Sequence, residues 1–323
     1  MAESLEDYSL RRSVEQKKKG GLKKVGIVGC GNMGQQIVRL ISQQGLDVVF
    51  IDLSAERINQ IKKDIEAALD RVINKWGLTE SEKRAIMSRI RGSTDYNDIS
   101  DCQMVIETVN IKTRASSIPL RMEVLRKIES VVGEDTIIAS NNATLMISDL
   151  ASVLKKPERA VGLNFITPAS KVRIVEVIRG LQTSDYTMDF TVRFIKSLDK
   201  KPITLVESPG NISTRLFVPL INEACELLME GVASVSCIDE TMKLGFGLQL
   251  GPFELADRVG IDKVQKWMDN LYQEFGSDKF KPSPIIKRLV RANQLGRKVS
   301  KGFYTYENEK IVSQAIHAIE FNQ

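Results

Sequence analysis

The stretch VGIVGCGNMG at residues 25–34 decides the fold. A short apolar run is followed by glycines in the spacing G-x-G-x-x-G, and residues 35–44 have the composition of a helix. A second apolar run, 48–51, ends at Asp52, which lies 23 residues after Gly29. Strand, glycine-rich turn, helix, strand and acid in this order predict the dinucleotide-binding unit of a Rossmann-type domain.

Each part of this unit has its own physical task. Gly29 permits a tight turn, Gly31 lets the backbone approach a pyrophosphate, and Gly34 lets the helix pack closely on the strand. Asp52 can accept hydrogen bonds from both ribose hydroxyls and would repel a 2′-phosphate, so the expected cofactor is NAD rather than NADP. A glycine-rich turn in some other α/β fold is the alternative. The expected cofactor-binding residues are Gly29, Cys30, Gly31, Asn32, Met33, Gly34, Asp52 and Glu107.

Further short apolar runs predict the rest of a sheet. They span 104–106, 136–139, 160–163, 172–178 and 203–206. Helical segments separate most of them, which is the pattern of right-handed crossovers in a parallel, doubly wound sheet. The first three runs end at Glu107, Asn141 and Asn164. Because ligands of such sheets lie beyond the carboxyl ends of the strands, these side chains are expected at one edge with the glycine-rich turn.

From Glu207 onward only helices are expected. They span 214–230, 237–244, 252–259, 261–275 and 284–292. The fold class is therefore α/β, with a Rossmann-type doubly wound, mainly parallel sheet followed by a smaller all-α C-terminal domain. Large apolar helix faces favour a homodimer, although such stripes are more often plain core. The expected divisions are 1–23 as a charged flexible tail, 24–206 as the NAD-binding domain, 207–306 as a helical substrate and dimerisation domain, and 307–323 as a C-terminal tail or short helix.

Composition narrows the classes of function. The 323 residues fit two domains, and 42% apolar with 27% charged residues is typical of a globular protein. No apolar run reaches the roughly 20 residues of a membrane-spanning helix, and no secretory signal is visible. A cytoplasmic protein without membrane contact is therefore expected. The net charge of +5 owes much to residues 1–24, and no concentrated basic face or RNA-binding motif indicates nucleic acid.

Histidine and cysteine usage argues against a metal site. His317 is the only histidine, which excludes His-rich metal sites and any triad with a centrally placed His. The cysteines are far apart without a CxxC pair, so neither zinc nor a disulfide framework is indicated. Each is expected to be a small buried residue: Cys30, Cys102, Cys225 and Cys237.

Taken in order, these motifs resemble those of the NAD-dependent 3-hydroxyacyl-CoA dehydrogenases, of the 3-hydroxybutyryl-CoA dehydrogenase type. The resemblance implies an oxidoreductase of fatty acid metabolism that transfers hydride between the nicotinamide and C3 of a short-chain 3-hydroxyacyl-CoA or 3-oxoacyl-CoA. It covers nearly the whole chain between residues 24 and 306. The matching stretches are residues 25–34, 105–107, 138–141, 175–178, 223–224, 230–233, 251–257, 296–298 and 301–304.

The same resemblance implies a His as general base and a Glu that orients it. Glu176 stands for the Glu, but twelve residues upstream, at the place of the His, the chain has Asn164. Ala143 stands where the family has a Ser that contacts substrate, and Thr167 and Thr214 each stand where it has an Asn. The residues expected at the catalytic site are Glu176, Asn164, Asn141, Ala143, Thr167 and Thr214.

Asn164 leaves three interpretations open. A carboxamide can hydrogen-bond a carbonyl or hydroxyl but cannot take up a proton near pH 7, and losing a positioned base costs about 10²- to 10⁴-fold in rate. The first interpretation is a family oxidoreductase of low activity. The second is a non-catalytic protein that binds NAD or CoA, as a partner or regulator of an active relative. The third is a structural hydrogen-bonded pair of Asn164 and Glu176 without a ligand.

A bound acyl-CoA is expected to meet the helices predicted between residues 54 and 88. Arg57, Lys62 and Lys63 offer contacts to its phosphates, although a solvated charged face is the commoner explanation.

Overall fold

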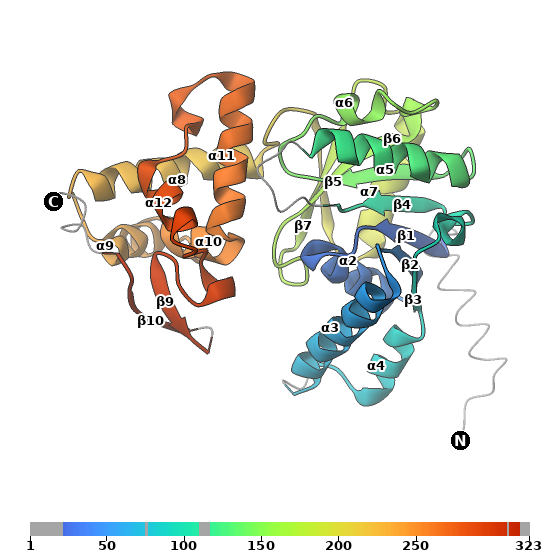
Figure 1. The fold of residues 1–323 in the computed structure, drawn as a ribbon, viewed down its shortest axis with the longest axis horizontal. Coiled ribbons are helices and arrows are strands. Elements are labelled where there is room, and N and C mark those ends of the chain that lie inside the picture. Colours follow the sequence, from blue (N-terminus) through green and yellow to red (C-terminus); the bar gives the residue numbers. More distant parts are fainter. Residues whose placement is uncertain (1–21, 75–76, 110–116, 309, 317–323) are drawn as a thin grey trace. The chain divides into compact units, whose positions relative to one another are not determined.

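A computed structural model describes residues 22–74, 77–109, 117–308 and 310–316 (Figure 1). Almost all of the expected N-terminal tail and the lone His317 lie outside the described residues. The chain divides into two compact units, one that ends at Glu207 and one that begins at Ser208.

The first unit is built on one eight-stranded sheet. Its strands are β1 (Lys24–Val28), β2 (Asp47–Ile51), β3 (Ile90–Ser93), β4 (Met104–Glu107), β5 (Ile137–Asn141), β6 (Ala160–Phe165), β7 (Ile174–Arg179) and β8 (Lys201–Val206). Their spatial order is β3-β2-β1-β4-β5-β6-β7-β8, and every neighbouring pair is parallel except β6 and β7. The first six follow the order 3-2-1-4-5-6 of dinucleotide-binding sheets, which confirms the expected α/β fold.

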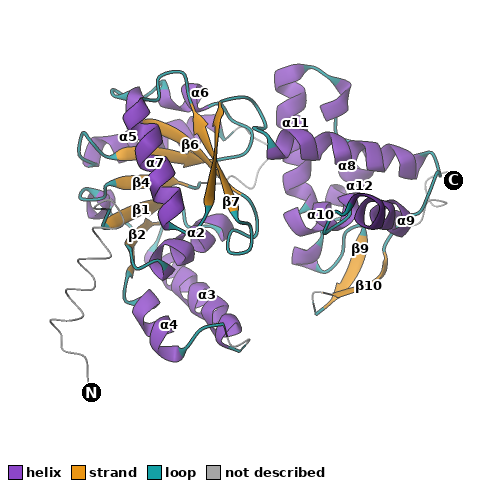
Figure 2. Cartoon of the chain, turned by 180° about the vertical axis from the view of Figure 1, so that it is seen from behind, coloured by secondary structure: helices purple, strands orange, loops and turns teal. Residues whose placement is uncertain are grey.

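Helices cover both faces of this sheet (Figure 2). Buried side chains of α2, α3 and α7 pack in one core and those of α5 and α6 in another. Successive strand residues supply the two cores in turn, as Ile27 and Val28 do in β1, because strand side chains alternate between faces. The helices are α2 (Asn32–Gln43), α3 (Ala55–Ile73), α4 (Glu80–Met87), α5 (Ile118–Val131), α6 (Ile147–Ala151) and α7 (Asp185–Ser197), with 3₁₀ turns at Tyr96–Ile99 and Pro157–Arg159.

Local sequence signals explain several boundaries, but not the edge strand β3. Thr79 and Glu82 form a capping box at the start of α4, as the spacing T-x-x-E predicts. The stretch of β3 carries only one apolar residue, Ile90, so its pattern did not indicate a strand. The strand forms because β2 offers it a parallel partner, and Gly92 leaves room for the ring of Phe50.

The second unit is mainly helical and contains all five expected helices. These are α8 (Ser213–Met229), α9 (Val235–Glu240), α10 (Pro252–Val259), α11 (Ile261–Phe275) and α12 (Pro284–Arg291). The helix expected over 237–244 is shorter than predicted and continues as a π-helical turn, Thr241–Gly245. Short 3₁₀ turns lie at Asp278–Phe280 and Arg297–Val299, and a hairpin joins β9 (Tyr304–Glu307) to β10 (Lys310–Gln314).

The hairpin corrects the expectation for the C-terminal segment. Residues 310–314 form a strand rather than a tail or the start of a short helix, because they pair with β9. Two buried carboxylates fasten this hairpin to the helices. Asp239 accepts from the hydroxyl of Tyr304 and Asp257 from that of Tyr306, each at 2.8 Å. The C-terminal domain is thus helical with a small added hairpin.

Three of the four cysteines are buried, as expected. Cys237 differs because it lies exposed on α9, a helix of six residues. None of the helices within the described part of the chain combines the length and apolar character needed to cross a membrane. Among the same residues, no cluster of three His, Cys, Asp or Glu side chains is placed to hold a metal ion.

Candidate functional site

The glycine-rich turn has the conformation that its sequence predicts. Gly29 has a φ of +83°, a left-handed conformation that L side chains rarely adopt. A Cβ on Gly34 would lie 2.7 Å from both the carbonyl oxygen of Gly29 and Oγ1 of Thr108. A Cβ on Gly31 would meet no atom within 4 Å. Gly34 is therefore required for packing, whereas Gly31 leaves open space at the start of α2.

This open helix start fits a pyrophosphate. Gly31 is the N-cap of α2 and has no side chain to bond the first helical amides. Such amides attract anions because they carry the positive end of the helix dipole. The following residues, Asn32 and Met33, are the first of the helix.

Asp52 joins the turn to the end of β2. Its Oδ2 accepts from the backbone amide of Cys30 at 2.9 Å, and Oδ1 accepts from that of Leu53 at 2.8 Å. Arg57 Nε lies 3.9 Å from Oδ1. The Cys30 thiol faces the core, and burial raises its pKa. Cys30 therefore contributes its backbone to this site, and Asp52 stands where a ribose is expected.

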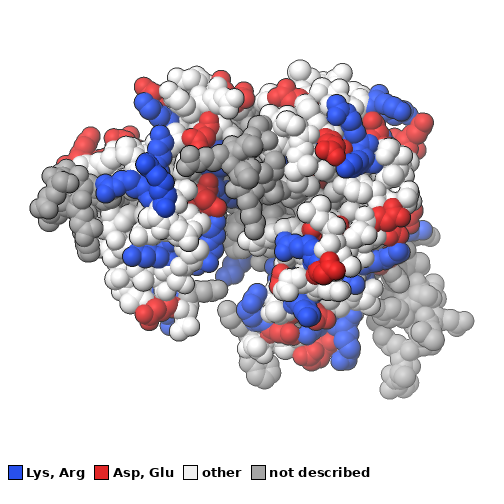
Figure 3. Space-filling model, viewed as in Figure 1, with Lys and Arg blue, Asp and Glu red and all other residues white. Residues whose placement is uncertain are grey.

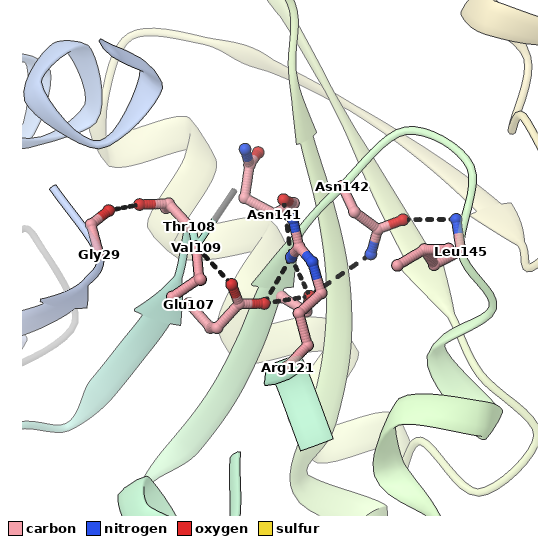
Figure 4. A network of polar contacts seen from close by, with 9 residues as sticks. Gly29, Glu107, Thr108, Val109, Arg121, Asn141, Asn142 and Leu145 are labelled. Carbon is pink, nitrogen blue, oxygen red and sulfur yellow. Dashed lines mark hydrogen bonds and ion pairs between the residues drawn. The ribbon is translucent and has the colours of Figure 1, made fainter. Parts of the chain in front are cut away.

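Glu107 belongs to a buried network of polar contacts (Figure 4). Its side chain is fully buried, and its Oε2 lies 2.5 Å from NH1 of Arg121 and accepts from Oγ of Ser140 at 2.7 Å. Oε1 accepts from the amide of Val109 at 2.5 Å. Both carboxylate oxygens are thus used inside the protein, at the ends of β4 and β5.

Sequence reasoning missed Arg121, the partner of Glu107. It lies in the first turn of α5 and is itself buried. The available signal was a lone arginine among the apolar positions of that helix, facing a strand that ends in a glutamate. Next to this pair, Oγ1 of Thr108 donates to the carbonyl of Gly29, so the end of β4 is tied to the glycine-rich turn.

Asn164 and Glu176 form a hydrogen-bonded pair. They face each other in the antiparallel register of β6 and β7, and Asn164 Nδ2 donates to Glu176 Oε2 at 2.7 Å. Asn164 is 6% exposed and Glu176 is 1% exposed. Asn141, at the end of β5, accepts from the amide of Phe165 through Oδ1 at 3.0 Å. The expected Asn141, Asn164 and Glu176 therefore gather at neighbouring strand ends.

The remaining substrate-side residues lie in three different places. Ala143 is buried in the turn after β5, which Asn142 closes by accepting from the amide of Leu145 at 2.8 Å. Thr167 precedes Pro168 in the segment after β6. Thr214 belongs to the second unit, where it is buried in α8.

The helices expected to meet CoA carry mixed charge. Basic and acidic side chains lie together on the face drawn in Figure 3. Within α3 and α4, Lys83 Nζ lies 2.5 Å from Asp70 Oδ1 in an ion pair. Arg57 and Lys63 are exposed and Lys62 is half-buried. A contact of these three residues with CoA stays a prediction.

Comparisons with known proteins agree with this arrangement. Residues 24–208 match the family model of the 3-hydroxyacyl-CoA dehydrogenase NAD binding domain, and residues 210–306 match that of the C-terminal domain. The probable 3-hydroxybutyryl-CoA dehydrogenase of Deinococcus radiodurans is 36% identical over 283 residues, 88% of this chain and 100% of that protein. The 3-hydroxybutyryl-CoA dehydrogenase of Clostridioides difficile is 35% identical over 88% of this chain and 99% of its own length.

Solved structures give the same result. The crystal structure of (S)-3-hydroxybutyryl-CoA dehydrogenase from Ralstonia eutropha has a TM-score of 0.80 and 40% identity, and the match covers 89% of this chain and 100% of that one. The match to the NAD binding domain confirms the expected cofactor, NAD. Since both domain models match in order and together span most of the sequence, this chain belongs to the 3-hydroxyacyl-CoA dehydrogenase family.

Proposed function

We propose that the protein is a 3-hydroxyacyl-CoA dehydrogenase of low activity. It would transfer hydride between NAD and C3 of a short-chain 3-hydroxyacyl-CoA or 3-oxoacyl-CoA. The substrate class is supported by the names of its relatives. The observation that carries the low activity is the hydrogen bond from Asn164 Nδ2 to Glu176 Oε2, which puts a carboxamide where the family resemblance implies a base.

The cofactor half supports NAD binding. The open space at Gly31 leaves room for a pyrophosphate, and Asp52, which accepts from the amide of Cys30 at the end of β2, would accept hydrogen bonds from a ribose. When bound, NAD supplies the acceptor or donor of the hydride. We assign residues 24–206 to this task, and residues 207–306 to substrate binding and subunit pairing.

The residues expected on the substrate side can orient the substrate, but the one in the place of the base cannot take up its proton. Asn164 can accept or donate a hydrogen bond to the reacting oxygen, yet it cannot take up the proton that a 3-hydroxyl must lose on oxidation. Ala143 has no hydroxyl to bond this oxygen. The proton then has to leave to water or to Glu176, and the missing base costs about 3 to 5.5 kcal/mol of barrier.

The test is NADH oxidation with acetoacetyl-CoA beside an NADH titration on the same sample. We expect NADH to bind and turnover to fall about 10²- to 10⁴-fold below the roughly 10 s⁻¹ of a median enzyme. Asn164→Ala is a second variant. It removes the hydrogen bonds of Asn164 to the reacting oxygen and to Glu176, so its turnover and its stability are expected to fall further. Ordinary turnover by the unaltered protein would contradict the proposed role of Asn164.

A second candidate is a non-catalytic protein that binds NAD and acyl-CoA as a partner or regulator. It is favoured by the contrast between the complete cofactor turn and the altered substrate positions Asn164, Ala143 and Thr167. Equilibrium dialysis with NADH and with a non-hydrolysable acyl-CoA analogue, next to the turnover assay, separates the two. Tight binding without any turnover supports the second candidate.

A homodimer through the helical unit is part of the same proposal. Leu244 and Phe246, two residues apart in sequence, are exposed by 85% and 74%, which is unusual for two large apolar side chains. Sedimentation of the protein and of a Leu244→Asp/Phe246→Asp variant tests this point. A dimer that the variant converts to a monomer is expected, and a monomeric unaltered protein would contradict it.

A further inference from the structure

We propose that Arg121 is a positioning residue for the nicotinamide half of the cofactor site, and that it acts through Glu107 and Asn141. The proposal rests on the proposed function only in requiring that NAD binds, not that it reacts. Arg121 reaches neither the glycine-rich turn nor Asp52 in the contacts described. It holds instead the ends of β4 and β5 (Figure 4).

The position of Arg121 in the fold explains its reach. α5 follows β4, so its first turn lies at the carboxyl edge of the sheet. Side chains of helices lean toward the helix N-terminus, which directs Arg121 to that edge. From there its NH1 contacts Glu107 Oε2 at 2.5 Å, Ser140 Oγ at 3.1 Å and the carbonyl oxygen of Asn141 at 3.3 Å.

The register of the strands makes this contact a bridge between them. Glu107 and Ser140 are direct partners in the parallel pairing of β4 and β5, and Ser140 donates to Glu107 at 2.7 Å. Nη1 of Arg121 thus lies within hydrogen-bond distance of three groups on two strands, and its two hydrogens can serve two of them at a time. The bond to the Asn141 carbonyl fixes the backbone from which the Asn141 side chain projects.

Glu107 also restrains the first residues after β4. Its Oε1 accepts from the amide of Val109, and the neighbouring Thr108 bonds to the carbonyl of Gly29. A displacement of Glu107 is therefore expected to move the first residues after β4. In a sheet of order 3-2-1-4-5-6, the strands β4 to β6 form the second mononucleotide half, opposite to the half that begins at β1 and β2.

The two halves of the site can therefore be probed separately. ADP contacts only the half made by the glycine-rich turn and Asp52, whereas NADH occupies both. If Arg121 positions the second half, its loss weakens NADH and spares ADP. If it only stabilises the fold, both ligands weaken together.

The variant for this test removes both charges. Breaking a buried ion pair on one side leaves the other charge uncompensated, so Glu107→Gln is combined with Arg121→Met. The glutamine keeps an oxygen for the amide of Val109. We expect the affinity for NADH to fall at least about tenfold, because small displacements of positioning groups have large effects, and the affinity for ADP to stay unchanged.

The chain offers a matched control at the other end of α5. Glu129 and Arg159 form a second ion pair, 3.0 Å apart and with side chains 10% and 8% exposed. Arg159 directly precedes β6, so this pair lies at the amino ends of the strands, away from the cofactor edge. Glu129→Gln/Arg159→Met is expected to lower the stability like the first double variant but to leave NADH and ADP binding unchanged.

Isothermal titration with NADH and with ADP, beside thermal unfolding, decides the proposal. Unchanged NADH affinity, or an equal loss for both ligands, would overturn it. Arg121→Lys provides a second variant should the double variant not fold. Lysine keeps the charge opposite Glu107, but its side chain is one bond shorter and has no guanidinium plane, so a selective loss of NADH affinity that is smaller than in the double variant is expected. If the unaltered protein bound no NADH at all, the proposed function would fail instead.

Discussion

Replacing Asn164 by His should restore a general base at this site. In both residues the first side-chain nitrogen is attached to Cγ, so His Nδ1 in the same rotamer would occupy the place of Asn164 Nδ2. That nitrogen now donates to Glu176 Oε2 at 2.7 Å. Glu176 would hold the Nδ1–H tautomer, which leaves Nε2 able to accept a proton from the 3-hydroxyl.

The magnitude follows from what the substitution adds. A positioned base contributes about 10²- to 10⁴-fold, equal to about 3 to 5.5 kcal/mol of barrier. Asn164 is only 6% exposed, so the larger imidazole overfills its site and is expected to lower the stability by about 1–3 kcal/mol. The gain in kcat/KM therefore has to be compared with the fraction of protein that is folded.

The assay is NADH oxidation with acetoacetyl-CoA, with NADH titration and thermal unfolding on the same preparations. The control is Asn164→His/Glu176→Gln, in which the carboxylate that orients the ring is lost and the rate should fall back. Adding Ala143→Ser, Thr167→Asn and Thr214→Asn supplies the other polar groups, with effects that need not add. A folded Asn164→His variant that binds NADH and turns over no faster than the unaltered protein would refute this reasoning.

Three other predictions concern the cofactor site and the helical unit. Gly31→Ala should leave the stability unchanged but lower the NADH affinity about tenfold or more. Gly34→Ala should lower both the stability and the NADH affinity, because its methyl group would meet protein atoms and that of Gly31→Ala would not. Thermal unfolding and NADH titration distinguish the two variants. Asp52→Asn should narrow the preference for NADH over NADPH, since Arg57 would then face a 2′-phosphate without a competing carboxylate, and titration with both nucleotides measures this. In the helical unit, burial raises the pKa of Asp257 to about 6, although the hydrogen bonds that it accepts lower it. Its proton is thus held more tightly in the folded than in the unfolded chain. About 3 kcal/mol of stability, fully present below the ordinary Asp pKa of 3.8, should be lost as the pH rises through 6. Urea unfolding should show this loss in the unaltered protein and not in Asp257→Asn.

The sequence was sufficient where a local rule determines the structure. The glycine spacing predicts a turn whose Gly29 has a positive φ and whose Gly34 has no room for a Cβ. The position of Asp52 at the end of the second strand predicts that it lies beside the glycine-rich turn, and in the structure Asp52 accepts from the backbone amide of Cys30. These features depend on residues close in sequence or on a single crossover, so the periodicity and spacing of the sequence are enough to predict them.

The sequence was insufficient where partners far apart in the chain decide. β3 forms because of its neighbour and not because of its own composition. β10 likewise pairs with β9, which Asp239 and Asp257 hold in place. Arg121 could not be assigned to Glu107 because its place among the apolar positions of α5 indicates that it turns inward but does not show which acid it meets.

The Asn164 substitution illustrates how chemistry and stability separate at one position. Glu176 is almost completely buried, and a buried carboxylate that loses a donor is destabilised. Asn164 supplies that donor through Nδ2, in the place where a His would supply Nδ1–H. Under the proposed function, the strand pair keeps this hydrogen bond although the side chain at 164 cannot take up a proton. An aliphatic residue at 164 would also remove this hydrogen bond. We therefore expect Asn164→Leu to destabilise the first unit, and Asn164→His to destabilise it much less. The same argument explains how the cofactor half can remain complete, because Asp52 and the glycine-rich turn are held by bonds in which Asn164 takes no part.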